Sequence, residues 1–140
     1  MSESEIRNVY FMGICGTGMG SLAGLVQSQG CKVTGSDEHV YPPMSTRLAE
    51  GGIPVLEGYK AEHLDSKPDL VVVGNVIRKT NPEAVAMREL GLNHISMPEA
   101  IARFGIGDKH SIVVAGTHGK ATTSSLIAHL LMDADLEPSY

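Results

Sequence analysis

The sequence has 140 residues, enough for one ordinary domain and little more. Its formal net charge of −5 argues against nucleic-acid or membrane-surface partners, since both need a concentrated basic surface. No apolar run approaches the roughly 18 residues of a membrane span, and the acidic start Met1–Glu5 does not resemble a secretory signal. Cys15 and Cys31 form no metal-ligand spacing, so we expect free thiols in a reducing, cytoplasmic location.

A glycine-rich turn lies near the start of the chain. The apolar run Val9–Met12 stops at Gly13, Gly16 and Gly18, and apolar residues return from Met19 at helical spacing, which predicts strand, tight turn and helix. Glycine lets a ligand approach the backbone, and the start of a helix directs free N–H groups at an anion. The turn therefore predicts a phosphate site, with a turn that binds nothing as the alternative.

A second strand is expected to carry an acidic residue to the same place. The helix should end at Gly30, and Cys31–Gly35 should form a strand followed by Ser36 and Asp37. Asp37 lies 19 residues beyond Gly18, close to the offset of about 20 residues at which a carboxylate binds a nucleotide ribose. A solvated loop carboxylate is the alternative.

The middle of the chain predicts shorter elements. Pro42 and Pro43 exclude a helix and predict a loop across the end of the sheet. A short helix is expected over 45–50 and a short strand over 53–56. His63 could face a ligand, but an isolated histidine is more often a surface or core residue, and it implies no metal.

A continuous β-branched run over 69–75 predicts a strand buried on both faces, as in a parallel sheet. Asn75 stands at its carboxyl end, where open α/β sheets bind ligands. Alternatively, Asn75 only closes its own turn. Asn81 and Pro82 predict a helix start, as the N-cap and the first helical residue.

The first domain is expected to end in a linker. The helix that starts at Pro82 should stop at Gly91, and a short strand over 94–96 and a short helix over 98–104 should follow. Gly105–Asp108 then has the composition of a linker. The alternation of strands and helices predicts a Rossmann-like α/β domain over residues 1–107: an open, mostly parallel sheet with helices on both faces.

A second pattern starts after the linker. Ser111–Ala115 is expected to form a buried strand, Gly116–Thr123 a turn, and residues from about 119 to 132 a helix. In a phosphate loop, backbone N–H groups surround the phosphates and a lysine places its charge on their oxygens. Lys120 stands where such a lysine is needed. The alternative is a solvated lysine in an ordinary turn.

The complete phosphate-loop pattern, G-x-x-x-x-G-K-[ST], is nevertheless not present. Val114 occupies the position of its first glycine, and Ala121 occupies the position of the hydroxyl that holds Mg²⁺. A methyl group cannot coordinate a metal, so Thr122 or Thr123 would have to supply the oxygen. We therefore expect weakened Mg²⁺ binding unless one of these neighbours substitutes.

Two motifs, Gly13–Met19 and Ala115–Lys120, lie one domain's length apart. Together they resemble the amino-terminal part of the Mur ligases of bacterial cell-wall synthesis. Gly35–Asp37, Val40–Thr46 and Gly74–Asn75 are most similar to the branch that joins UDP-N-acetylmuramate to the murein tripeptide L-alanyl-γ-D-glutamyl-meso-diaminopimelate in peptidoglycan recycling. The branch that adds L-alanine is the alternative, because it shares the lysine-containing loop.

The resemblance implies a reaction in which ATP phosphorylates the lactyl carboxylate of UDP-N-acetylmuramate and the tripeptide amine then displaces phosphate, with Mg²⁺ as cofactor. It implies contacts of the UDP-sugar with Gly13, Gly16, Thr17, Gly18, Met19, Ser36, Asp37 and Asn75. It implies contacts of ATP with Gly116, Thr117, His118, Gly119, Lys120, Ala121 and Thr122, with Lys120 as a catalytic residue and Thr122 as the metal ligand.

Members of the family have three domains and are longer than this chain. By the resemblance, residues 1–107 would be the UDP-sugar-binding domain, and residues 108–140 the first strand, phosphate loop and helix of the ATP-binding domain. We expect the chain alone to be inactive, and its unpaired strand to pack on the first domain or to pair with another copy in a dimer. A rival of another class is an NAD-binding module, against which Cys15 weighs because it replaces the middle glycine of the dinucleotide fingerprint.

Overall fold

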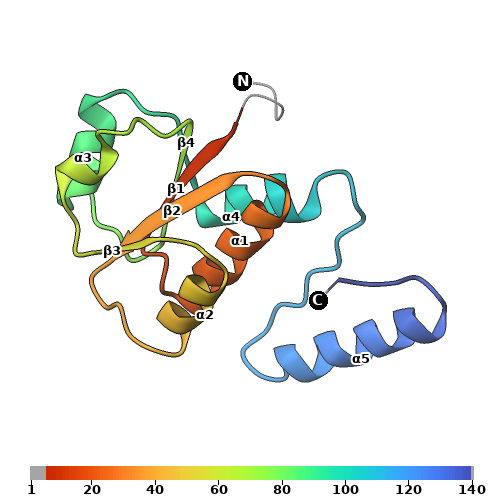
Figure 1. Ribbon diagram of the computed structural model, residues 1–140. Helices are drawn as coiled ribbons and strands as arrows, with labels where there is room; N and C mark the ends of the chain where they lie inside the picture. The colour runs from red at the N-terminus through yellow and green to blue at the C-terminus, as the bar shows by residue number, and fades with distance from the viewer. Residues whose placement is uncertain (1–5, 140) are drawn as a thin grey trace. The chain divides into compact units, whose positions relative to one another are not determined.

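The computed structural model describes residues 6–139, and the chain divides into two compact units after Gly107. The first unit is built on five parallel strands in the order β3-β2-β1-β4-β5 (Figure 1). The predicted open α/β fold is therefore confirmed. The strands are β1 (Asn8–Met12), β2 (Lys32–Asp37), β3 (Val55–Glu57), β4 (Leu70–Val73) and β5 (His94–Ser96).

Helices cover both faces of this sheet (Figure 1). Helices α1, α2 and α4 pack on one face, and α3 and the 3₁₀ segment η2 pack on the other. The helices of the first unit are α1 (Thr17–Ser28), α2 (Met44–Glu50), η2 (Ala61–Leu64), α3 (Pro82–Glu89), α4 (Met97–Ala100) and the π-helical η3 (Ile101–Ile106).

The sequence of β1 does not alternate between apolar and polar residues, because both faces of the strand are covered. Val9 and Phe11 belong to the core cluster that includes α1 and α2, whereas Tyr10 and Met12 belong to the cluster that includes α3 and η2. All four side chains are buried. A strand between two layers of helices needs apolar residues on both faces, so a period of two is absent.

Two glycines let the neighbouring strands approach β1. A Cβ atom on Gly35 of β2 would lie 2.6 Å from the carbonyl oxygen of Phe11. A Cβ atom on Gly74, just after β4, would lie 2.8 Å from the carbonyl oxygen of Met12. Both distances are shorter than real carbon–oxygen contacts, so the spacing of the central strands depends on these glycines.

The helix starts follow their capping residues. The Asn81 side chain accepts hydrogen bonds from the N–H groups of Glu83 and Ala84, and Pro82 is the first residue of α3, as predicted. Helix α4 begins one residue earlier than expected, because Ser96 and Glu99 form a reciprocal capping box. It then continues as η3 rather than ending at Phe104.

The second unit contains helix α5 (Lys120–Asp133). The predicted strand Ser111–Ala115 is wrong: residues 110–116 have no regular structure, and the Val113 side chain is 83% exposed. A strand needs a neighbour for its hydrogen bonds, and the described part of this unit holds no other strand. The dimer expected through this strand therefore has no support in the structure.

Within residues 6–139, no helix is both long enough and apolar enough to cross a bilayer.

Candidate functional site

The strand register brings the predicted site residues to one edge of the sheet. Met12, the last residue of β1, pairs with Ser36 of β2 and with Val73 of β4. Met12, Ser36 and Val73 are followed directly by Gly13, Asp37 and Gly74. These three residues therefore lie together at the carboxyl edge of the sheet. Open parallel sheets bind their ligands at this edge.

The first half of the glycine turn is fastened to β2. The N–H groups of Gly13 and Ile14 donate to the carbonyl oxygen of Ser36, at 2.8 and 3.0 Å. Gly13 has φ = +80°, a left-handed conformation that glycine adopts without strain. The Gly13 amide is thus already paired, and its glycine is needed for the shape of the turn.

The second half of the turn is open. Gly16, Thr17 and Gly18 are exposed, and α1 starts at Thr17 without a side-chain cap. No acceptor within residues 6–139 receives the N–H groups of these three residues. Three unpaired amides at the positive end of a 12-residue helix suit an anion such as a phosphate.

Asp37 holds this turn in place. Its Oδ2 accepts from the Cys15 N–H at 2.9 Å, and its Oδ1 accepts from the His39 N–H at 2.9 Å. Burial, and secondarily the Asp37 charge, raise the pKa of the half-buried Cys15 thiol. Burial thus favours the protonated thiol of Cys15, which packs against the core. The predicted contact of Asp37 with a ribose stays a prediction.

Asn75 lies exposed after β4. Its turn is closed by the Ile77 N–H, which donates to the Gly74 carbonyl at 3.1 Å, and within residues 6–139 the Asn75 side chain makes no hydrogen bond. The turn that holds Asn75 is thus closed by a backbone hydrogen bond, as one of the two alternatives expected, and the ligand contact of Asn75 stays a prediction. The amide is available at the same edge as the open amides of the glycine turn.

Tyr59 belongs to this edge and was missed as a site residue. A Cβ atom on Gly13 would lie 3.8 Å from its hydroxyl oxygen. Burial, and after it the negative charge of Asp37, raise the pKa of Tyr59 to about 12, so the phenol stays protonated. Its position two residues after β3 follows the rule of the carboxyl edge, which could have found it.

Two predicted site residues face inward. Met19 belongs to α1, and its side chain lies in the core. Ser36 is fully buried, and its hydroxyl donates to Glu83 Oε2 at 2.6 Å. Neither side chain is exposed at the carboxyl edge of the sheet.

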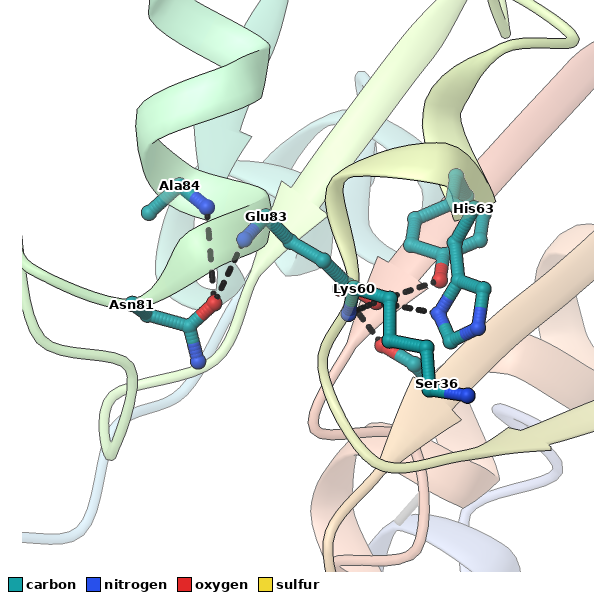
Figure 2. A network of polar contacts seen from close by, with 7 residues as sticks. Ser36, Lys60, His63, Asn81, Glu83 and Ala84 are labelled. Atoms are coloured by element: carbon teal, nitrogen blue, oxygen red, sulfur yellow. Dashed lines mark hydrogen bonds and ion pairs between the residues drawn. The ribbon is translucent and has the colours of Figure 1, made fainter.

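A buried polar network surrounds the Glu83 side chain (Figure 2). Glu83, in the first turn of α3, has no exposed surface and lies 2.7 Å from His63 Nδ1 as well as close to Ser36. The alternative of a satisfied core histidine thus describes His63. An acidic residue in the first turn of a helix usually faces water, so the burial of Glu83 could not be predicted from its position at the start of α3.

The second glycine turn belongs to the second unit. Gly119 has φ = +73° and precedes α5, whose first residue is Lys120. Lys120 Nζ donates to the Gly116 carbonyl at 2.7 Å, and His118 Nδ1 lies 3.1 Å from the Thr117 hydroxyl. The lysine charge therefore lies over its own loop at the start of a helix, an arrangement that suits an anion.

The residues that follow Lys120 determine whether a metal fits. Ala121 and Thr122 are exposed in the first turn of α5, and within residues 6–139 the Thr122 side chain makes no hydrogen bond. Ala121 has only a methyl group to offer. Thr122 thus has a free hydroxyl that could serve as a metal ligand, whereas the usual position after the lysine has none.

The parallel sheet and its glycine turn define an α/β protein of the kind that binds phosphate-bearing ligands at the carboxyl edge. A profile described as "Mur ligase family, catalytic domain" matches residues 8–107. The chain belongs to the Mur ligase family.

Named relatives agree with this assignment. The UDP-N-acetylmuramate--L-alanyl-gamma-D-glutamyl-meso-2,6-diaminoheptandioate ligase of Escherichia coli K12 is 42% identical over 94% of this chain and 29% of its own length. The UDP-N-acetylmuramate--L-alanine ligase of Paenarthrobacter aurescens is 42% identical over 97% of this chain and 29% of its own. A crystal structure of a murein peptide ligase from Psychrobacter arcticus superposes with a TM-score of 0.85, at 44% identity over 92% of this chain and 27% of that one. The chain thus spans less than a third of the length of these relatives.

Proposed function

We propose that this chain binds UDP-N-acetylmuramate, with the diphosphate on the open amides of Gly16, Thr17 and Gly18. The observation that carries this proposal is that these three N–H groups, at the start of α1, have no acceptor within residues 6–139. The names of the relatives support the choice of ligand. Asn75 and Tyr59 lie at the same edge and are suited to polar contacts with the rest of the sugar nucleotide.

We further propose that the protein acts as an ATP-dependent ligase for the murein tripeptide. ATP transfers its γ-phosphoryl group to the lactyl carboxylate, and the tripeptide amine attacks the resulting acyl phosphate, so that an amide forms and phosphate leaves. Phosphoryl transfer mainly needs charge neutralisation and positioning, which the Lys120 loop is suited to supply. Because so much of the relatives' length lies outside this chain, we expect the 140 residues alone not to catalyse ligation.

The choice of amine rests on the Escherichia coli relative, whose name gives the tripeptide, and on the likeness to the murein peptide ligase of Psychrobacter arcticus. L-alanine is the alternative, because a relative named for it is equally identical. Assaying a protein of the relatives' full length that carries this sequence with tripeptide and with L-alanine separates the two. We also propose a cytoplasmic location, which the free thiols of Cys15 and Cys31 support.

The binding proposal is tested by calorimetric titration of the 140-residue chain. We expect UDP-N-acetylmuramate to bind with a dissociation constant of about micromolar order, and NADH to give no heat of binding. NADH is the informative second ligand, because the pyrophosphate of a dinucleotide must come close to the backbone at the position where Cys15 replaces a glycine. Binding of NADH without a response to the UDP-sugar would contradict the proposal.

The metal that we propose for ATP binding is Mg²⁺, with Thr122 as its protein ligand. When bound, Mg²⁺ neutralises charge on the phosphate oxygens. We expect Ala121→Thr to strengthen ATP binding by about tenfold in the presence of Mg²⁺, because it adds an oxygen directly after Lys120. The measurement is ATP titration, with and without Mg²⁺, into a protein of the relatives' full length.

Ala121→Val is the matched control for this substitution. Valine has the shape of threonine without its hydroxyl, so it should leave the Mg²⁺-dependent affinity near that of Ala121. If the threonine and valine variants bind ATP alike, the hydroxyl at position 121 has no role and the metal argument is wrong.

A further inference from the structure

The buried carboxylate of Glu83 is hydrogen-bonded to residues from segments far apart in the chain (Figure 2). Its Oε1 accepts from the Tyr10 hydroxyl at 3.0 Å and from the Lys60 N–H at 3.4 Å, and it lies 2.7 Å from His63 Nδ1. Its Oε2 accepts from the Ser36 hydroxyl at 2.6 Å. Strands β1 and β2, the segment before η2, and η2 itself are thereby tied to the start of α3.

One of these bonds leads to the glycine turn. Ser36, whose hydroxyl binds Glu83, also accepts the Gly13 and Ile14 N–H groups at its carbonyl oxygen. The open amide of Gly16 lies only two residues beyond Ile14. Glu83 therefore binds the Ser36 side chain, and the Ser36 carbonyl holds the glycine turn. Glu83 itself does not reach the exposed edge.

The chemistry of the network favours a carboxylate at this position. Every group that contacts the Glu83 side chain can donate a hydrogen bond, and a carboxylate offers two acceptor oxygens to them. Glutamine has nearly the same shape, but its NH₂ group would oppose donors. In a buried network such a mismatch shifts the partners, because no water is at hand to replace the lost bonds.

We infer that Glu83 is a positioning residue for the sugar-nucleotide site: through Ser36 it holds the glycine turn in the conformation that presents the amides of Gly16, Thr17 and Gly18. This inference deepens the proposed function and rests on it only for the identity of the ligand. The positioning itself is a property of the free protein, so it is measurable without ligand.

The test compares three variants of the 140-residue chain by ¹⁵N–¹H NMR and by titration. In Glu83→Gln and Ser36→Ala, we expect the amide resonances of residues 13–18 to shift and the affinity for UDP-N-acetylmuramate to fall about tenfold. His63→Phe is the control. It removes another group that contacts the same carboxylate, and within residues 6–139 His63 has no hydrogen bond to Ser36 or to the turn. It should lower stability while leaving those resonances and the affinity within about twofold of the parent chain.

The outcomes separate this inference from the proposed function. Unchanged turn resonances in both Glu83→Gln and Ser36→Ala overturn the positioning role, as does an equal loss of affinity in His63→Phe, which would indicate general destabilisation. If Glu83→Gln does not fold, Ser36→Ala decides alone. If the parent chain does not bind the UDP-sugar, the proposed function fails, and the turn resonances still decide the role of Glu83.

Discussion

Replacing Thr17 with proline is expected to weaken the binding of UDP-N-acetylmuramate by about tenfold to a hundredfold while the chain keeps its fold. Proline removes an N–H group that we propose as a donor to the diphosphate, and a hydrogen bond to a charged group contributes about 1.5–3 kcal/mol. The helix should tolerate the change, because Thr17 is the first residue of α1, a position that proline favours. Gly16 already has φ = −64° and ψ = 144°, the conformation that suits a residue before proline.

Thr17→Val provides the control for this experiment, since it removes the hydroxyl and keeps the N–H group. Calorimetric titration gives the affinity of each variant, and circular dichroism checks that α1 is retained. Valine should bind nearly as well as the parent chain. A proline variant that binds the UDP-sugar as tightly as the parent would show that the Thr17 amide is not a ligand contact.

Replacing Gly35 with alanine is expected to destabilise the first unit by about 3 kcal/mol, the upper end of the usual cost of overpacking a core. The added methyl group would lie 2.6 Å from the Phe11 carbonyl oxygen and 2.8 Å from Ile14 Cδ1. The carbonyl belongs to the central strand and cannot rotate away, so β1 and β2 would have to separate. The measurement is urea unfolding followed by circular dichroism.

Gly24→Ala is the opposite case in the same unit. Gly24 lies within α1, and a Cβ atom there would meet nothing within 4 Å. Alanine should therefore stabilise the chain by about 1 kcal/mol through helix propensity. If both alanine variants unfold at the same urea concentration as the parent chain, the close approach of the strands at Gly35 is not a determinant of stability.

The parallel sheet could be predicted because its determinants are local in the sequence. The unbroken apolar runs of β1 and β4 indicate strands covered on both faces, and Asn81 followed by Pro82 marks the start of α3. The same local rules failed at residues 111–115. That run is apolar and β-branched, but its state depends on a partner strand that apolar character alone cannot guarantee.

The site could be predicted in position but not in the direction of its side chains. Spacing placed Asp37 beside the glycine turn, yet its carboxylate binds the N–H groups of Cys15 and His39. Likewise, Ser36 lies at the carboxyl edge of β2 but directs its hydroxyl to Glu83. Distance along a chain gives no information on which partners a side chain meets, because those partners come from other strands and helices.

The outermost strands of the sheet, β3 and β5, are each three residues long. Another chain can add to a sheet by pairing with the backbone of an edge strand. An edge strand of three residues offers few unpaired N–H and C=O groups for such pairing. The first unit should therefore resist fibril-like stacking at high protein concentration, even though its central strands are apolar.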